Sequence, residues 1–212
     1  MTSPFHPYLE KCCAELFTRT APEWIDLAVE MIDAQRALIA SDFAVKAPAA
    51  NVGLDFDEPM AAAIECDAAL FGTLLYRIEH GIFRRDPAHP ALPYLAQIMR
   101  ARTGMELYYS TEIGPRFRVI HGMGVVLGPR NRIGSDFTIY QGVTLGQRRQ
   151  NSPHETMVIG DHCTIFSGAK VLGAVRLGDG VRVGANAVLL TDAEPHSTYA
   201  GSPAVKVSGA KA

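Results

Sequence analysis

Branched aliphatic residues recur at every sixth position in the second half of the chain. In the most regular stretch they are Ile159, Ile165, Val171, Leu177, Val183 and Leu189. A small or modest apolar residue follows each of the first five at the fourth position after it. A period of six fits neither the roughly 3.6 residues of a helical turn nor the simple alternation of a strand. It is typical of a hexapeptide parallel β-helix, in which short strands alternate with tight corners.

The same period begins soon after residue 105, but it has two interruptions. The earlier anchors are Ile113, Val119 and Val125 and then, after a slip of two residues, Leu127, Ile133, Ile139 and Leu145. Fourteen residues separate Leu145 from Ile159 where twelve would keep the phase, so we expect residues 147–157 to bulge out as a loop. Loops on a rigid scaffold often carry function. After Leu189 the register fades, and residues 194–197 predict a turn into a tail.

The first half of the chain has helical periodicity instead. Apolar residues at helical spacing follow Pro22 as far as Leu38, and proline is tolerated in a first turn. A weak linker is expected over 44–56 and a second helix over 58–83, with one apolar face. A short third helix is expected over 92–102, after a proline-containing loop and before Gly104.

These patterns predict an α+β chain of three parts. They are a helical N-terminal domain (1–105), a parallel β-helix (106–191) and a C-terminal tail (192–212). A bare scaffold without chemistry is the alternative to an enzyme, but the interruptions of the repeat coincide with histidines. We therefore favour an enzyme.

Composition narrows the class of protein further. The 212 residues are 48% hydrophobic and 20% charged, with a formal net charge of −2, as in an ordinary globular protein. Near-neutral charge argues against a nucleic-acid partner, and no apolar run reaches the ~18 residues of a membrane span. The four cysteines form no CxxC pair, and the N-terminus lacks a secretion signal pattern. We expect a cytoplasmic protein with reduced thiols and no membrane partner.

Four segments resemble the serine O-acetyltransferase family. They are His121-Gly-Met-Gly-Val-Val-Leu-Gly, Ile133-Gly-Ser-Asp-Phe-Thr-Ile-Tyr-Gln-Gly-Val-Thr-Leu-Gly, Gly168-Ala-Lys-Val-Leu-Gly and Tyr199-Ala-Gly-Ser-Pro-Ala-Val-Lys-Val. The resemblance is dense over 104–208, with a weaker echo in Leu75-Tyr-Arg-Ile-Glu-His80. It implies a left-handed β-helix with three hexapeptides per coil, assembled as a homotrimer or a dimer of trimers. It also implies acetyl-CoA as co-substrate, lying in a groove between neighbouring subunits that the tail covers.

Acetyl transfer from a thioester to a hydroxyl needs a base, because an alcohol is a poor nucleophile at neutral pH. His121 follows the Val119 anchor by two residues, where its side chain should leave the core, and it matches the family's catalytic histidine. Glu106 falls where the family has an orienting carboxylate, more often Asp; Asp136 and Glu112 are weaker candidates. His154, in the expected loop, resembles the family's second active-site histidine.

The resemblance also implies binding residues. A CoA site of small residues and phosphate-binding lysines would comprise Gly146, Ser167, Gly168, Lys170, Ala185, Ala200, Gly201 and Lys206. Arg148 and Arg149, in the loop, and His80 are candidates for binding the acceptor. Asp55, Asp57 or Asp67 could replace the family's acidic contacts in the helical domain.

The chain departs from the family around the acceptor. Ile120 stands where the family has an Asp that receives the substrate ammonium, and Pro153 stands where it has an Arg. Pro129 replaces a glutamate. Losing a charged contact weakens the reason to bind an amino acid. The expected acceptor is L-serine or a related small hydroxy compound, and the alternative is a sugar or polysaccharide hydroxyl, since Arg116-Phe-Arg-Val-Ile-His equally resembles exopolysaccharide acetyltransferases.

Two further partners are not expected. The zinc enzymes of this fold need three converging histidines, and the spacings of His121, His154 and His162 do not resemble theirs, so no metal is expected. The chain ends in Gly-Ala-Lys-Ala rather than the terminal isoleucine with which family members dock into cysteine synthase. We therefore expect no such complex.

Overall fold

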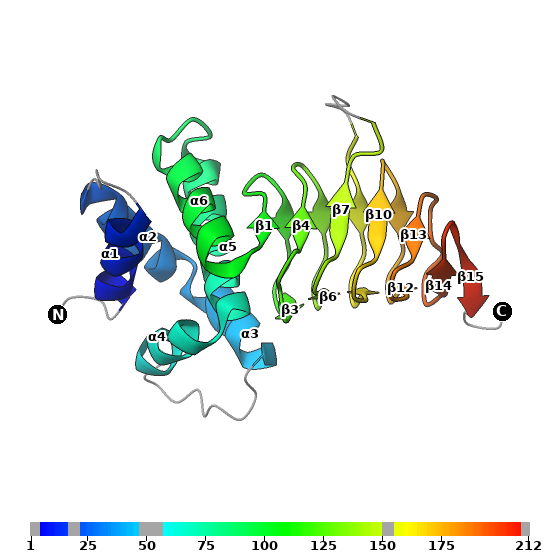
Figure 1. Ribbon diagram of the computed structural model, residues 1–212, viewed down its shortest axis with the longest axis horizontal. Coiled ribbons are helices and arrows are strands. Elements are labelled where there is room, and N and C mark those ends of the chain that lie inside the picture. The colour runs from blue at the N-terminus through cyan, green and yellow to red at the C-terminus, as the bar shows by residue number, and fades with distance from the viewer. Residues whose placement is uncertain (1–4, 17–21, 47–56, 150–154, 209–212) are drawn as a thin grey trace.

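The protein is a helical domain followed by a straight β-helix, with the chain ends at opposite ends of the molecule (Figure 1). The computed structural model describes residues 5–16, 22–46, 57–149 and 155–208. The helices are α1 (Phe5–Leu16), α2 (Pro22–Ala34), α3 (Arg36–Lys46), α4 (Asp57–Cys66), α5 (Ala68–Arg85) and α6 (Ala91–Thr103). The α+β class and the order of its two parts are confirmed.

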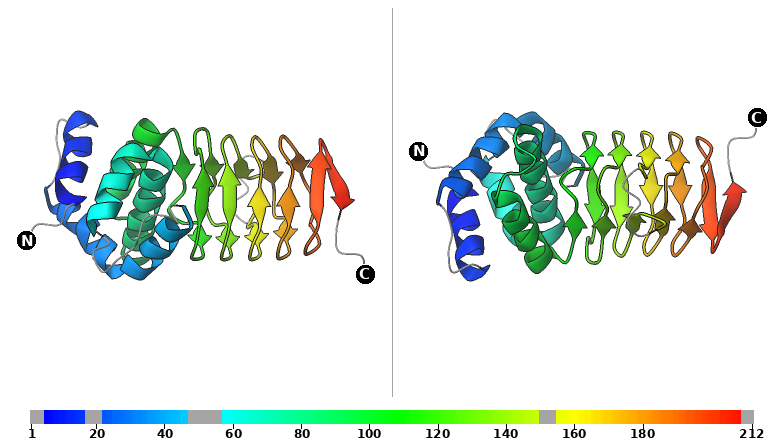
Figure 2. Two further views of the ribbon diagram at one scale, coloured as in Figure 1. Left: turned by 90° about the horizontal axis from the view of Figure 1, so that it is seen from below. Right: turned by 90° about the horizontal axis from the view of Figure 1, so that it is seen from above.

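Three parallel sheets form the faces of the β-helix, seen as rows of strands in the two views of Figure 2. Face A contains β1 (Glu106–Leu107), β4 (Val126–Leu127), β7 (Thr144–Gly146), β10 (Lys170–Leu172) and β13 (Val188–Leu189). Face B contains β2 (Glu112–Ile113), β5 (Arg132–Ile133), β8 (Val158–Ile159) and β11 (Arg176–Leu177). Face C contains β3 (Arg118–Ile120), β6 (Thr138–Tyr140), β9 (Thr164–Ile165), β12 (Arg182–Val183) and β14 (Thr198–Gly201), and β15 (Ala204–Ser208) pairs antiparallel with β14. The left-handed sense of the coil stays a prediction.

The six-residue anchors point inward and stack in columns. On face A the anchors of four successive strands, Leu127, Leu145, Val171 and Leu189, are each 0% exposed. They pair in register, so that Leu145 lies beside Leu127 on one side and Val171 on the other. Burial of each such side chain stabilises the fold by about 1.5–3 kcal/mol. The period therefore predicted the core of the β-helix correctly.

A polar residue occupies one of the inner positions. Asn131 is 5% exposed, yet its side chain is hydrogen-bonded at both ends. Its Nδ2 donates to the Gly128 carbonyl at 2.9 Å, and its Oδ1 accepts from the Met157 amide at 3.3 Å. Gly128 lies in the same coil as Asn131 and Met157 in the next coil, so the Asn131 side chain links two stacked coils at the corner between faces A and B in place of apolar packing.

The interruptions of the period fall at defined corners. A regular coil holds 18 residues, as in the pairing of Ile165 with Val183. The slip of two lies between β3 and β4. Leu145 lies on face A and Ile159 on face B, and a step between these faces normally takes six residues, as from Leu127 to Ile133. The fourteen residues found here therefore contain an insertion of eight residues, not the two expected. The sequence could not show this, because only strand pairing reveals which face follows.

Other expectations hold only in part. The six-residue spacing does break after Leu189 and a turn follows at 195–196, but the coil itself continues, because Ala193 bridges to Leu177 and Tyr199 pairs with Val183. The single helix expected over 58–83 is two helices, because the Asp67 side chain accepts hydrogen bonds from the Ala69 and Leu70 amides and starts α5 anew. The helix expected after Pro22 likewise divides at Gln35 into α2 and α3.

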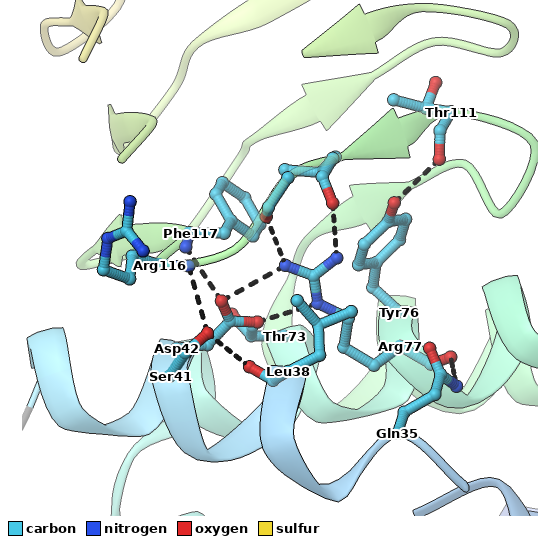
Figure 3. Close-up of polar contacts among 12 residues, drawn as sticks. Gln35, Leu38, Ser41, Asp42, Thr73, Tyr76, Arg77, Thr111, Arg116 and Phe117 are labelled. Atoms are coloured by element: carbon cyan, nitrogen blue, oxygen red, sulfur yellow. Dashed lines mark hydrogen bonds and ion pairs between the residues drawn. The ribbon is translucent and has the colours of Figure 1, made fainter. Parts of the chain in front are cut away.

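A buried ion pair joins the helical domain to the first coil (Figure 3). The guanidinium of Arg77, on α5, donates to both carboxylate oxygens of Asp42, on α3, at 2.7 and 3.2 Å. It also donates to the carbonyls of Ile113 and Gly114, while Asp42 accepts from the Phe117 amide. These bonds fix α3 and α5 against the first coil at the corner between faces B and C, just before β3, the strand that leads to His121.

Candidate active site

His121 lies at the corner between faces C and A, where the slip of two residues occurs. Its backbone is left-handed, with φ of 64°, and Gly122 and Gly124 after it have φ of 76° and 72°. The Met123 amide donates to the His121 carbonyl, and the Val125 amide to the Gly122 carbonyl, which closes the turn. The two extra residues therefore produce a protruding corner, and the His121 side chain on it is exposed.

The start of α5 abuts this corner. A Cβ placed on Gly122 would lie 3.4 Å from the Cβ of Ala69, in the first turn of α5. Lys46 Nζ donates to the carbonyl of Val119, two residues before His121, at 2.6 Å, and lies 3.5 Å from Asp67 Oδ2. The helical domain thus brings one cation and one carboxylate to the neighbourhood of His121. Asp67 was one of three acidic candidates from the sequence; no local pattern pointed to Lys46.

Glu106 runs alongside the same turn. Its amide donates to the Val125 carbonyl, and the Gly124 amide donates to the Gly104 carbonyl, so the start of β1 is hydrogen-bonded directly to the end of the His121 corner. The Glu106 side chain is half-buried. In the part of the chain that the structure describes, no hydrogen bond or ion pair joins its carboxylate to His121.

The alternative carboxylates already have cationic partners. Asp136 forms a two-point ion pair with Arg116, which holds the pKa of Asp136 below its usual range. It also lies 3.4 Å from His162. Glu112, on face B, lies within 4 Å of Arg84 and Arg132. Among the described residues Glu106 has no such ion pair, and its backbone is hydrogen-bonded to the turn that carries His121.

The small residues of the expected CoA site divide between two places. A Cβ on Gly124 would lie 3.6 Å from the Gly142 Cα, and one on Gly142 would lie 3.5 Å from the Gly168 Cα. The corners that hold His121, Ser167–Gly168 and Ala185 therefore stack along one edge of the β-helix. Ala200 continues that edge, since a Cβ on Gly184 would lie 3.3 Å from its Cβ. Gly201 follows as the last residue of β14.

The other members of that expected set lie elsewhere or have a partner within the chain. Gly146 ends β7 and pairs with Leu172, at the opposite end of face A from the His121 corner. Lys170 projects from β10, and its Nζ donates to the Gly142 carbonyl. Lys206 Nζ lies 2.6 Å from Glu194 Oε2 in the C-terminal hairpin. Lys170 is the lysine of this set that approaches the edge of small residues.

The acceptor candidates are also dispersed. His154 lies outside the described residues. Arg148 and Arg149, both exposed, begin the loop after β7, and the Arg148 amide donates to Glu155 Oε2 at 3.0 Å. His80 lies twelve residues into α5, about 18 Å along the helix from the end near His121. Its Nδ1 is bonded to the Tyr109 carbonyl at 2.8 Å, and burial lowers its pKa, so His80 is a half-buried histidine with a partner in its own chain.

The described residues contain no cluster of three or more His, Cys, Asp or Glu side chains able to hold a metal ion. No helix within the described ranges is long and apolar enough to cross a membrane. The candidate site thus has four parts among the described residues: the exposed His121, the half-buried Glu106, the Lys46–Asp67 pair and the edge of small residues.

Comparison with known proteins gives this arrangement a context. Residues 156–191 match the bacterial transferase hexapeptide family (six repeats). A serine acetyltransferase of Helicobacter pylori is 41% identical over 135 residues, which cover 64% of this chain and 78% of that protein. One of Bacillus licheniformis is 37% identical over 158 residues, covering 72% and 73%. The crystal structure of a Brucella abortus serine acetyltransferase in complex with coenzyme A matches with a TM-score of 0.81 and 18% identity, over 98% of this chain and 82% of that one, which shows a shared fold.

Proposed function

Because the chain belongs to the serine acetyltransferase family, we propose that it transfers the acetyl group of acetyl-CoA to the hydroxyl of L-serine, with His121 as general base. In this reaction the acceptor oxygen attacks the thioester carbonyl while the imidazole takes the hydroxyl proton. The carbon–sulfur bond then breaks, and the same proton passes to the departing CoA sulfur. Such a base contributes a factor of about 10²–10⁴ to the rate.

The single observation that carries this proposal is the shared edge of His121 and the small-residue corners. Gly168 and Ala185 present little side chain there, so an extended cofactor can approach the backbone closely. The amides and carbonyls of such corners suit the amide groups of pantetheine. A thioester lying along this edge would end near His121, which is exposed and free to meet it.

Glu106 is proposed to orient the imidazole. Its amide is hydrogen-bonded to the Val125 carbonyl, at the end of the turn that carries His121, and the proposal is that its carboxylate faces the ring. A carboxylate in this position would fix the ring's tautomer and stabilise the imidazolium that forms during attack. Glu106→Gln should lower kcat, while Glu106→Asp, which keeps the charge, should restore most of it. Equal losses in both variants would contradict an orienting role for the carboxylate.

The serine acceptor is supported by the names of the relatives and by Asp67. Ile120 removes the carboxylate that the family carries before its histidine, but Asp67 approaches the same corner from α5. Its carboxylate is 35% exposed, caps α5 through one oxygen and lies 3.5 Å from Lys46 through the other, so an ammonium group beside the acceptor hydroxyl would share it with Lys46. The half-buried Ile120 is the specific observation that favours the alternative, a sugar or polysaccharide hydroxyl, because it offers an apolar surface instead of a charge.

The decisive experiment measures thiol release from acetyl-CoA with serine, homoserine and a panel of sugars. Wild-type protein should respond to serine, and silence from every hydroxy amino acid would favour the sugar acceptor. His121→Asn tests the base, since Asn tolerates the left-handed backbone that Ala would strain. His162→Asn is the matched control, because His162 is exposed at another corner with φ of 57°. His121→Asn should lower kcat by at least ~10² and His162→Asn should not; comparable activity in both would remove the base assignment.

The assembly belongs to the same proposal. A trimer would bring a neighbouring β-helix against the His121 edge and enclose CoA between subunits, and the helical domain would pair two trimers. Light scattering coupled to size exclusion measures this directly. The expected absence of a complex with cysteine synthase also stays a prediction.

A further inference from the structure

A hollow lies on face C near the C-terminal end of the β-helix, where β12, β14 and β15 lie side by side (Figure 1). Its volume is about 440 Å³, within the ~300–1,000 Å³ of small-molecule sites. The described residues that line this face C hollow are His162, Thr164, Gly180, Arg182, His196, Thr198 and Ser208. Each side chain among them can donate a hydrogen bond, and none of them is apolar or acidic.

Strand pairing brings the hydroxyl groups of the hollow to Arg182. Arg182 pairs in register with Thr164 on one side and with Thr198 on the other, and Thr198 pairs with Ser208. The residue that follows each of Thr164, Arg182 and Thr198 is buried, so these three side chains face outward. Neighbouring strands lie about 4.8 Å apart, so a ligand bound to Arg182 would be within reach of the adjacent hydroxyl groups.

Two histidines border the hollow at the corner between faces B and C. His162, Gly180 and His196 occupy the same position in three successive coils, since each lies two residues before an outward-facing residue of the hollow. A Cβ on Gly180 would lie 2.6 Å from His196 Nδ1, so the His196 ring leans over Gly180. The missing side chain at Gly180 therefore leaves the space into which the imidazole brings its nitrogen.

The charge of Arg182 has no partner among the residues that the structure describes, since no hydrogen bond or ion pair joins its guanidinium to any of them. The carboxylates of the same corner are already engaged. Asp161 and Asp179 each accept a backbone amide of a neighbouring coil. Asp136, which is held in a two-point ion pair, lies 3.4 Å from His162. The described lining thus offers a permanent positive charge and several donors, with no negative charge.

A phosphate group complements this set of donors. Its oxygens can accept from guanidinium, imidazole and hydroxyl groups together, and arginine binds phosphate through two parallel N–H groups. A cation would meet Arg182 with no carboxylate of the lining to offset it. We propose that the face C hollow binds a phosphate group, as inorganic phosphate or as a small phosphate monoester, with Arg182 as its main partner.

The hollow is separate from the small-residue edge proposed for CoA. Thr198 begins β14 and Gly201 ends it, so the two lie roughly 10 Å apart at about 3.3 Å per residue. His121 and the small residues of that edge are not part of the described lining. The proposal therefore does not rest on acetyl transfer, and its test needs no acetyl-CoA.

The test is calorimetric titration of the full chain with inorganic phosphate, at an ionic strength held constant with chloride. Wild-type protein should bind one phosphate per chain. Arg182→Gln should weaken binding at least ~10-fold, because it removes the charge and the two-point contact. Thr198→Val, which keeps the shape and removes one hydroxyl group, should weaken it by a smaller factor. Arg118→Gln is the matched control and should bind as the wild type does, because Arg118 is an exposed, outward-facing arginine of the same sheet without flanking histidines.

Two further titrations define the ligand. Glycerol 3-phosphate that binds more tightly than inorganic phosphate would identify a monoester as the ligand, and equal or weaker binding would identify the free anion; either supports a phosphate site. CoA should bind alike to Arg182→Gln and to the wild type. The proposal is overturned if neither phosphate compound binds, if Arg182→Gln binds phosphate as tightly as the wild type, or if Arg118→Gln loses as much affinity as Arg182→Gln. A loss of CoA affinity in Arg182→Gln would also overturn it, because the hollow would then belong to the CoA site.

Discussion

The ion pair between Arg77 and Asp42 offers a quantitative test of how the helical domain is fixed to the β-helix. The two side chains are only 1% and 3% exposed, so neither charge can be solvated by water. Arg77 donates to two carboxylate oxygens and to the carbonyls of Ile113 and Gly114. Asp42→Ala removes the carboxylate that pairs with Arg77 and leaves the guanidinium with two neutral carbonyls among its described partners.

The magnitude follows from that geometry. Breaking a buried pair by removing one partner typically costs about 3–5 kcal/mol, because the remaining charge stays uncompensated. The Phe117 amide also loses its acceptor at 2.8 Å, which places Asp42→Ala towards the upper end. Arg77→Met should cost a similar amount. The double variant Asp42→Ala with Arg77→Met removes both charges, so its loss should fall short of the sum by about 0.5–3 kcal/mol.

Urea unfolding followed by circular dichroism measures these differences, at one protein concentration so that assembly does not shift the midpoints. Glu30→Ala is the control, because Glu30 pairs with Arg85 at 2.7 Å with both side chains more than half exposed. That pair should contribute at most about 1 kcal/mol. A loss under about 1 kcal/mol for Asp42→Ala, or strict additivity in the double variant, would refute the reasoning.

Three other predictions concern single positions. Burial raises the pKa of Glu79 well above its usual range, so the folded state keeps a proton that the unfolded state loses above about pH 4.5. The free energy of unfolding of the wild type should therefore fall relative to that of Glu79→Gln as the pH rises from 4.5 towards 8. Urea unfolding at several pH values measures both. A difference between the two proteins that does not change with pH would contradict a raised pKa for Glu79. Gly114→Ala should lower the free energy of unfolding by about 1–3 kcal/mol, because its Cβ would lie 2.7–2.8 Å from the backbone of the next coil. Gly146→Ala is the control, because its Cβ would meet only side-chain atoms at 3.6 Å or more, and it should change the melting temperature little. Burial raises the pKa of Cys163 to about 11, so a thiol reagent at pH 8 should label the exposed Cys66 first, and rapid native labelling of Cys163 would be inconsistent with this structure.

Much of the candidate site was predictable because it depends on a local period. Inward and outward positions of a β-helix alternate within each hexapeptide, so the anchors mark the core and their interruption marks the exposed corner at His121. Glu106 was proposed from the family resemblance, which places an orienting carboxylate about one coil before the histidine, and its role stays a prediction. Lys46 and Asp67 reach that corner from helices in another domain, and only the pairing of Lys46 with the Val119 carbonyl shows it.

The sequence by itself determined the β-helix, its inward-facing residues and the presence of a helical domain, because these follow from spacing along the chain. Tertiary structure alone decided which face follows the long loop, since strands 18 or 26 residues apart must pair before the insertion can be measured. It also decided that His80 faces packed protein and that Glu79, its neighbour on α5, is buried in a pocket. The burial of a helical residue depends on which distant parts of the chain pack against the helix, so the local sequence does not predict it.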